Sequence, residues 1–246
     1  MKKLRLGIIG YGFMGQWHNN HAGTLEEVEI VAICDTDPEK RAEAPENVKL
    51  YTDYKALLAD SDVEWVMISV PNHLHHDIAI DAAKAKKNII VEKPCALNVQ
   101  EFDEMYQAAK DNGVLFTVDQ NRRWDRDYCT VKKVLEQNSI GKVFMVKSSH
   151  YGVFGRMHDW HEYPECGGGM LYDWGVHLID QMLDLIPGKI TQISADMKCA
   201  VNKSVDDYFR ILLYFDNGLA AEIELGTFLL KKLPRWYVAG DTGTLV

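Results

Sequence analysis

The first half of the chain alternates short apolar runs with segments of helical periodicity. The apolar runs, several of them rich in β-branched residues, are 4–9, 30–34, 65–70, 88–91 and 114–118. Such runs are typical of strands that are buried on both faces of a parallel sheet. The intervening periodicity predicts helices over residues 14–22, 54–59, 74–86 and 99–112. This alternation predicts a doubly wound α/β domain, which we place at residues 1–121.

The second half has a different pattern. Helical spacing predicts a linking helix over 126–137 and another helix over 172–185, and a strand run begins at 143–153. Alternating apolar and polar positions then predict long strands over 190–200, 208–215 and 219–229. Asp216-Asn217-Gly218 is typical of a hairpin turn between the last two strands. Residues 122–246 are therefore expected to form an α+β domain whose mostly antiparallel, open sheet is backed by a helix.

Composition narrows the class of protein. The 246 residues are 47% hydrophobic and carry 27 Lys plus Arg against 36 Asp plus Glu, a net charge of −9. These values are typical of a soluble globular enzyme or small-molecule binder, and the acidic balance argues against a nucleic-acid partner. No apolar run approaches the ~20 residues that span a bilayer, so no membrane partner is expected. The five cysteines are scattered and form no C-x-x-C pair, which favours the cytoplasm.

The first apolar run leads directly into a glycine motif, Gly10-Tyr11-Gly12-Phe13-Met14-Gly15. Gly10 permits a tight turn, Gly12 lets a pyrophosphate approach the backbone, and Gly15 lets the following helix pack on the strand. Asp35 lies 20 residues after Gly15 at the end of the second run, where a carboxylate accepts from ribose hydroxyls. The combination predicts a dinucleotide site, although a turn that binds nothing is the simpler alternative. NAD is favoured over NADP because Asp35 would repel a 2′-phosphate.

Three further motifs carry a family resemblance. They are Val70-Pro71-Asn72-His73, Glu92-Lys93-Pro94, and the segment from Gly167-Gly168-Gly169 through Asp173 and His177 to Asp180. With the glycine motif, they make the whole chain resemble the Gfo/Idh/MocA family of oxidoreductases. The resemblance implies a two-domain NAD(P)-dependent enzyme, with a Rossmann domain for the cofactor and an open-sheet domain that supports oligomer contacts. We therefore expect a homodimer or homotetramer formed through the C-terminal sheet.

The resemblance also implies roles for particular residues. Lys93 would be the active-site lysine, and Asp173 and His177 the acid and histidine that face the substrate. Pro71 and Asn72 would lie near the ribose and nicotinamide, with Glu92 beside them. We add Phe13, Met14 and His75 to the cofactor set, and Arg122, Trp160 and His161 to the substrate set. Trp160-His161 is a departure, because many members have a Trp-Arg pair there.

The chemistry of these side chains supports an alcohol oxidation. Such a reaction needs a hydride acceptor, which the nicotinamide supplies, and a group that takes the hydroxyl proton. Lys93 and His177 are candidates for the second, and a buried lysine near a positive ring would have a lowered pKa. Asp173 stands four residues before His177 on a predicted helix, so it could orient that ring. A surface lysine and a helical ion pair are the alternatives. The histidine clusters lack metal-site spacing, so no metal is expected.

The leading hypothesis is an NAD-dependent dehydrogenase acting on a secondary hydroxyl of a sugar, inositol or related polyol. The alternatives are a glycosidase that uses NAD in a transient oxidation and elimination, and a non-catalytic NAD-sensing regulator. Asp241-Thr242-Gly243 is typical of a turn, and Thr244-Leu245-Val246 of a strand just begun. Members of the family normally continue further, so we expect a C-terminally truncated chain whose second domain is incomplete.

Overall fold

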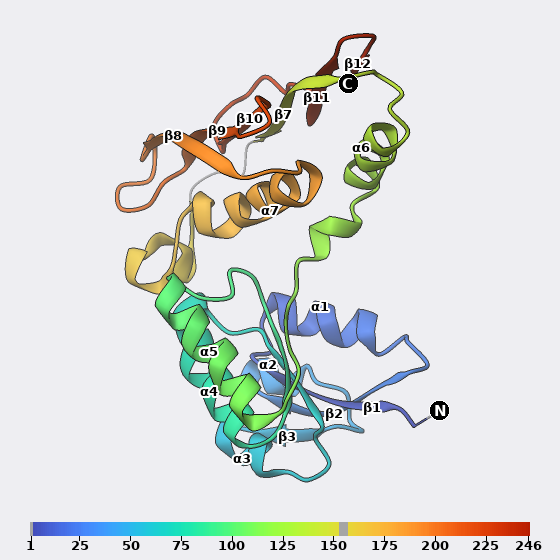
Figure 1. Cartoon of the computed structure of the whole chain (residues 1–246). Coiled ribbons are helices and arrows are strands. Elements are labelled where there is room, and N and C mark those ends of the chain that lie inside the picture. The colour runs from blue at the N-terminus through green and yellow to red at the C-terminus, as the bar shows by residue number, and fades with distance from the viewer. Residues whose placement is uncertain (1, 153–156) are drawn as a thin grey trace. The chain divides into compact units, whose positions relative to one another are not determined.

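The computed structural model describes residues 2–152 and 157–246. Val153, the last residue of one predicted strand, lies outside the described residues. The chain divides into two compact units, Met1–Asp119 and Gln120–Val246, and each is described here by itself (Figure 1).

The first unit contains a six-stranded parallel sheet with the strand order β3-β2-β1-β4-β5-β6. Its strands are β1 Leu4–Ile9, β2 Val28–Cys34, β3 Lys49–Tyr51, β4 Trp65–Ile68, β5 Asn88–Val91 and β6 Phe116–Val118. Its helices are α1 Phe13–Ala22, α2 Pro38–Ala42, α3 Tyr54–Ala59, α4 His75–Lys84 and α5 Val99–Asn112, with a 3₁₀ turn, η1, at Asn72–Leu74.

Both faces of this sheet are buried, as the continuous apolar runs predicted. Ile8 packs into one hydrophobic cluster with Ile33 of β2, whereas the next residue, Ile9, packs into a separate cluster with Ile68 of β4 and Met105 of α5. The doubly wound α/β class is thus confirmed. The strand order reverses direction between β1 and β4, and ligands of doubly wound sheets bind beyond the carboxyl ends of such strands.

Several predicted boundaries move in the structure. The predicted helix 74–86 is split between η1 and α4, and the predicted strands 65–70 and 114–118 shorten to β4 and β6. The sequence analysis missed α2 and β3. Helix α2 has five residues and is capped by the Asp37 carboxylate, which accepts from Glu39 N at 2.9 Å. Elements this short show no hydrophobic periodicity, so pattern reading does not detect them.

The second unit contains another six-stranded sheet, ordered β12-β11-β7-β10-β9-β8. Its strands are β7 Val143–Tyr151, β8 Ile190–Lys198, β9 Tyr208–Phe215, β10 Ala220–Gly226, β11 Trp236–Gly240 and β12 Thr244–Leu245. Its helices are α6 Arg126–Glu136 and α7 Val176–Leu185, a π-helical turn η5 at Leu171–Gly175, and the 3₁₀ turns η2 Asn121–Trp124, η3 Asp159–Glu162 and η4 Pro164–Cys166.

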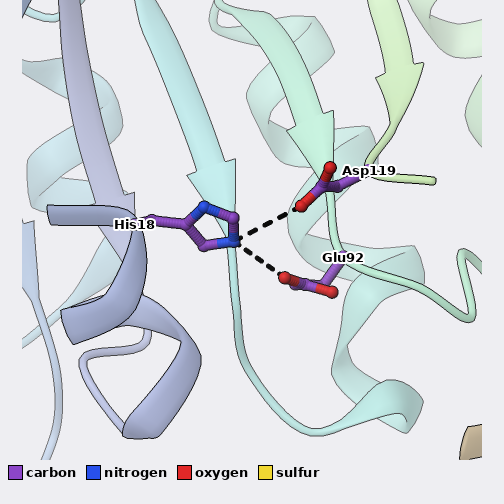
Figure 2. Close-up of side chains that lie close together, drawn as sticks. All are labelled: His18, Glu92 and Asp119. Atoms are coloured by element: carbon purple, nitrogen blue, oxygen red, sulfur yellow. Dashed lines mark hydrogen bonds and ion pairs between the residues drawn. The ribbon is translucent and has the colours of Figure 1, made fainter. Parts of the chain in front are cut away.

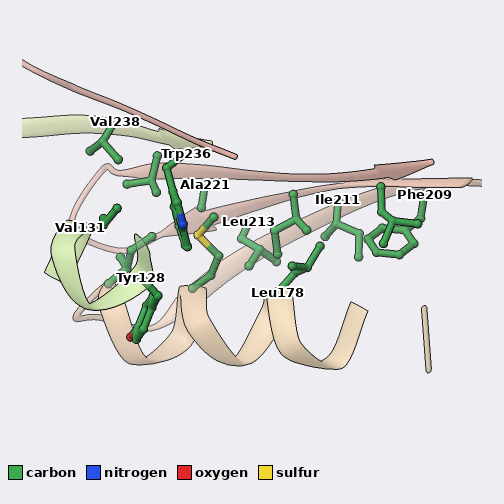
Figure 3. Close-up of a cluster of buried hydrophobic side chains, with 14 of the residues drawn as sticks. Tyr128, Val131, Leu178, Phe209, Ile211, Leu213, Ala221, Trp236 and Val238 are labelled. Carbon is green, nitrogen blue, oxygen red and sulfur yellow. The ribbon is translucent and has the colours of Figure 1, made fainter. Parts of the chain in front are cut away.

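The predicted, mostly antiparallel sheet is confirmed, with one parallel pair inside it. Strand β10 pairs antiparallel with β9 and parallel with β7, where Ala220 lies opposite Met145. Alternate residues of β9, among them Phe209 and Ile211, are buried against α7, and α6 adds Tyr128 to the same cluster (Figure 3). The intervening residues of β9, such as Arg210, face outward. Period-two patterning therefore gives this sheet one apolar face that its helices cover.

The predicted helix 172–185 begins differently from our expectation. Its first turn is the π-helical η5, which carries Asp173, and the α-helical part begins at Val176. π-Helical turns are rare and occur frequently at functional sites. Asp173 and His177 therefore do not lie on one uninterrupted α-helix. Among the described residues, no helix is long and apolar enough to cross a membrane.

Candidate functional site

The glycine motif forms a tight cradle between β1 and α1. Gly10 has a φ of +91°, and a Cβ atom there would lie 2.5 Å from the carbonyl oxygen of Ser69. A Cβ atom on Gly15 would lie 2.0 Å from the carbonyl oxygen of Gly10, so both positions exclude side chains. At Gly12 the corresponding space is open, with Lys40 Nζ at 4.0 Å as the nearest atom. Gly12 is thus the position at which a ligand has room to approach the backbone.

The start of α1 completes this cradle. The helix begins at Phe13, and its N-cap Gly12 provides no side-chain hydrogen bond, so the first amide groups have no side-chain cap. Uncapped amides and the helix dipole favour an anion at this end. Phe13 is 82% exposed, whereas the neighbouring Met14 is half-buried. The cradle therefore fits the pyrophosphate of a dinucleotide.

Asp35 lies at the end of β2, and its carboxylate faces the cradle. Oδ2 accepts from Tyr11 N at 2.7 Å and Oδ1 accepts from Asp37 N at 2.9 Å. Arg41 Nη1 donates to the Asp35 carbonyl oxygen at 2.6 Å, which ties α2 to the end of the strand. Each carboxylate oxygen has a second lone pair, so Asp35 can still accept from a ribose hydroxyl.

Three side chains that the sequence analysis did not combine meet at the carboxyl ends of β5 and β6. Figure 2 shows the ring of His18 from α1 directed at two carboxylates, with Nε2 at 2.7 Å from Glu92 Oε1 and 3.6 Å from Asp119 Oδ2. Glu92 Oε2 also accepts from Lys93 N at 3.0 Å, so one carboxylate joins α1 to the main chain of Lys93. Burial and the nearby charge of Glu92 raise the pKa of Asp119.

This cluster also has the composition of a metal site. Within the described parts of the chain it is the group of three His, Cys, Asp or Glu side chains whose ligand atoms all lie within 4.8 Å of one another. A metal bonds such ligands at about 2.0–2.2 Å each, so an ion would have to displace the hydrogen bond between His18 and Glu92. The arrangement is that of a hydrogen-bonded network beside Lys93, and the absence of a metal stays a prediction.

The loop after β4 contributes the residues of the Pro-Asn motif. Pro71 precedes η1, and Asn72 in that turn is buried. His75 is fully buried, and its ring nitrogens lie 2.9 Å from the carbonyl oxygens of Pro94 and Val70. Burial lowers the pKa of His75. The ring thus connects the two loops that carry Asn72 and Lys93, and any effect of His75 on a cofactor would act through these loops.

In the second unit, the glycine-rich turn packs against protein atoms. Cβ atoms on Gly168 and Gly169 would each lie 2.3 Å from an oxygen, the His161 carbonyl and Asp206 Oδ1 respectively. Main chain and Asp206 therefore already fill the space beside these two glycines. Asp206 Oδ2 also accepts from Leu171 N at 2.8 Å, which holds the first turn of η5.

The ring of Trp174 lies beside the predicted catalytic histidine. Trp174 stacks on His150 at 4.0 Å between ring centroids, the guanidinium of Arg122 lies 4.7 Å from the Trp174 centroid, and the His177 ring meets Trp174 edge-on at 6.0 Å. Burial, with Arg235 and Arg122 nearby, lowers the pKa of His150 to about 4. His150, Arg122 and His177 therefore all contact the Trp174 ring.

His177 itself is buried, and its Nδ1 lies 3.2 Å from Oε1 of Gln120. The sequence analysis assigned the orienting role to Asp173 and did not single out Gln120. Asp173, half-buried in η5, has a main-chain N–H that bonds to the Gly169 carbonyl at 3.0 Å. Trp160 and His161 stack on each other with their centroids 3.7 Å apart. The unit therefore brings Arg122, Trp174 and Gln120 to His177.

Comparison with known proteins covers both units. A model described as an oxidoreductase family with an NAD-binding Rossmann fold matches residues 4–120, and one described as the GFO/IDH/MocA C-terminal domain matches residues 128–246. An NAD-binding protein from Listeria innocua has a similar structure, with a TM-score of 0.96 and 41% identity over 99% of this chain and 72% of that chain.

Two curated relatives show the range of the similarity. An uncharacterized oxidoreductase of Schizosaccharomyces pombe, C115.03, is 35% identical over 72% of this chain and 49% of that protein. The scyllo-inositol 2-dehydrogenase (NADP(+)) IolW of Bacillus subtilis is 28% identical over 99% of this chain and 68% of that protein. The chain thus spans about half to two thirds of the length of these relatives.

Proposed function

Because the chain belongs to the Gfo/Idh/MocA oxidoreductase family, we propose that it is an NAD-dependent oxidoreductase acting on a secondary hydroxyl of a sugar, inositol or related polyol. The observation that carries this proposal is the cradle between β1 and α1, which leaves room at Gly12 and sets the Asp35 carboxylate beside Tyr11 N. The polyol class is supported by the resemblance to an inositol dehydrogenase.

In this proposal the cradle residues 10–15 hold the pyrophosphate and Asp35 holds the adenosine ribose, with Pro71 and Asn72 at the nicotinamide end. The bound cofactor supplies the acceptor for the hydride. NAD is preferred to NADP because the Asp35 carboxylate would repel a 2′-phosphate. Lys40 lies near Gly12, and its positive charge offsets part of the repulsion between Asp35 and a 2′-phosphate. We therefore expect weaker binding of NADP than of NAD, but not its exclusion.

Lys93 and His177 are the proposed proton-transfer groups, and Asp173 assists the second. Lys93 follows β5 at the edge of the sheet where doubly wound folds bind ligands, and the Glu92 carboxylate fixes its main chain. His177 is buried and meets the Trp174 ring edge-on, which restricts its orientation. Both side chains have the chemistry to take a hydroxyl proton.

The test is a panel of sugars and cyclitols with NAD or NADP, followed by NADH or NADPH absorbance. Lys93→Ala and His177→Ala should each lower turnover at least about 100-fold while NAD binding persists. Lys84→Ala, a change at an exposed lysine of α4, is the matched control and should behave as wild type. Near-normal turnover of either site variant would refute the assignment.

Two added measurements, sugar release from glycosides and a partner-binding assay, separate the alternatives. A glycosidase using transient oxidation would release sugar from glycosides without net NADH. A regulator would show NAD-dependent association with a partner and no turnover. Either result would replace the dehydrogenase proposal.

We also propose a homodimer or homotetramer that forms through the C-terminal sheet. The outward side of that sheet carries a network of ion pairs. Lys147 Nζ lies 3.0 Å from Glu222 Oε1, and Arg210 Nε lies 2.9 Å from the same oxygen. Phe144 and Tyr237 are large exposed side chains on β7 and β11. Light scattering of the purified protein tests this directly. The scattered cysteines of the sequence remain the argument for a cytoplasmic location.

A further inference from the structure

A short segment at the start of the second unit, Gln120–Trp124, is fastened to the helix that carries His177. Arg123 forms a two-pronged ion pair with Asp180 of α7, with Nε to Oδ2 at 2.8 Å and Nη2 to Oδ1 at 2.7 Å. At the next residue of α7, Gln181 Nε2 donates to the Arg122 carbonyl oxygen at 2.7 Å. Paired guanidinium–carboxylate bonds fix geometry as well as adding energy.

A third fastening lies at the other end of the helix. The Arg122 guanidinium covers the Trp174 ring of η5 at 4.7 Å, and the other partner of that ring, His150, stacks on it at 4.0 Å. Contacts therefore hold the segment on both sides of His177. These contacts between the segment and the helix (the frame) fix the position of Gln120, the first residue of the segment.

The consequence concerns the proton on His177. Gln120 Oε1 lies 3.2 Å from His177 Nδ1, and an amide oxygen can only accept. Nδ1 must then carry the hydrogen, and a neutral imidazole with a proton on Nδ1 has its lone pair on Nε2. We propose that Gln120 is a positioning residue that fixes His177 in the Nδ1–H tautomer, so that Nε2 accepts the substrate hydroxyl proton.

This inference rests on the proposed function for its chemistry, but the tautomer can be measured without substrate or turnover. In the reaction, the O–H bond breaks toward Nε2 and a carbonyl forms, while the C–H hydrogen leaves with its electron pair for the oxidised nicotinamide. A neutral glutamine orients the ring without adding a negative charge. A carboxylate at position 120 would stabilise the imidazolium and raise the pKa of His177, so a smaller fraction of the rings would be neutral and able to accept a proton near neutral pH.

The other charged and titratable groups of this frame stay constant in the test. They are Asp173 in η5, Asp180 on α7, Arg122 and Arg123 in the segment, and His150 on β7 behind Trp174. Asp180 is paired with Arg123 in the wild type and in each variant, so only the side chain at position 120 differs between the proteins that are compared.

The first measurement is independent of activity. Long-range ¹H–¹⁵N correlation spectra of the ¹⁵N-labelled full chain, assigned with His177→Asn, report which ring nitrogen is protonated. We expect a protonated Nδ1 and an unprotonated Nε2 in the wild type at neutral pH. Gln120→Leu should lose this preference and show a mixture of tautomers. A wild-type ring protonated at Nε2 would overturn the inference.

The second measurement is the pH profile of kcat/KM with the best substrate of the panel. Gln120→Glu should move the acid limb and the NMR titration of His177 upward together by about 1 pH unit or more. Gln120→Leu should lower kcat about 10- to 100-fold with the KM for NAD unchanged, an effect typical of lost orienting partners. Gln137→Leu, at an exposed position after α6, is the matched control.

The outcomes separate the two proposals. If Gln120→Glu shifted neither the pH profile of kcat/KM nor the NMR titration of His177, the positioning role of Gln120 would be overturned. A wild-type protein that oxidises no member of the panel but shows the Nδ1–H tautomer would overturn the proposed function and leave the tautomer assignment intact.

Discussion

Two glycines of the cradle are expected to respond in opposite ways to the same added methyl group. Gly15→Ala would place its Cβ atom 2.0 Å from the Gly10 carbonyl oxygen, in the contact between α1 and β1. Relieving that overlap requires a movement of about 1.4 Å to an ordinary carbon–oxygen distance. Overpacking of this kind costs about 3 kcal/mol, which corresponds to a loss of about 6–12 °C in Tm.

Gly12→Ala should leave stability nearly unchanged. Gly12 has a φ of −74°, which alanine also adopts, and its added Cβ atom meets only Lys40 Nζ at 4.0 Å. The stability change should stay within about 1 kcal/mol, because the small cost of alanine at an N-cap is offset by a stiffer unfolded chain. The same methyl group would occupy the space that a pyrophosphate needs, so NAD affinity should fall at least about tenfold, or ~1.4 kcal/mol.

The assay pairs thermal unfolding with calorimetric NAD titration on the full chain. The expected pattern is a stable Gly12→Ala variant that binds NAD poorly and a destabilised Gly15→Ala variant. If Gly12→Ala bound NAD with the wild-type Kd, the cofactor would not approach the backbone there. If Gly15→Ala melted as wild type, the packing of α1 on β1 would not depend on that glycine.

Three further predictions concern the choice between NAD and NADP, the titration of His150, and the hydrophobic core of the second unit. Asp35→Ser should raise the kcat/KM for NADP relative to NAD at least about tenfold by removing the repulsive carboxylate; an unchanged ratio in parallel assays would contradict the role of Asp35. The pKa of His150 falls from 6.5 to about 4 in the folded state, so stability that is full above 6.5 should decline as the pH drops toward 4. Urea unfolding at several pH values should show this decline and a shallower one in His150→Asn; equal slopes would speak against it. Phe209→Ala empties a fully buried position against Gly175 and should cost about 3–5 kcal/mol in the same assay, whereas a loss below about 1 kcal/mol would mean that the core closes over the gap.

The sequence predicted most of the first unit because parallel strands are buried on both faces. The run that became β1 is apolar apart from Arg5 and Gly7, and the run that became β5 is apolar after Asn88. Both predicted boundaries agree with the structure. Helix α5 was equally clear, since Asn98 caps its start and Gly113 ends it in the left-handed conformation. These signals are local in sequence, so they do not require knowledge of tertiary contacts.

The features that were missed depend on contacts between distant segments. Hairpin signals reveal antiparallel neighbours, but nothing local in β7 announces its parallel pairing with β10. The π-helical turn η5 has the same apolar spacing as an α-helix, and its start is held by Asp206 from another part of the chain. Hydrogen bonds between segments far apart in the sequence determine how β7 pairs and where η5 begins.

The proposed site residues come mostly from local signals of the same kind. Glycine, lysine and histidine positions were read from motifs, whereas His18, Asp119 and Gln120 carry no motif of their own. One signal could have found the last two: both follow β6 at the carboxyl edge of the parallel sheet, where ligand-facing side chains gather. Their partners, His18 and His177, lie far from them in sequence, so only the fold identifies the pairs.

The parallel pairing inside the second sheet has a consequence for the chain while the ribosome is still making it. Strand β7 ends at Tyr151, but its neighbours β10 and β11 start at Ala220 and Trp236, the nearer of them 69 positions later. At a synthesis rate of roughly 5–20 residues per second, about 3–14 s pass between the completion of β7 and the start of its first partner strand. Both of its edges stay open for that time, and open edges invite pairing with other nascent chains. The first unit, complete by Asp119, has no such delay, so chaperone demand during synthesis should concentrate on the second unit.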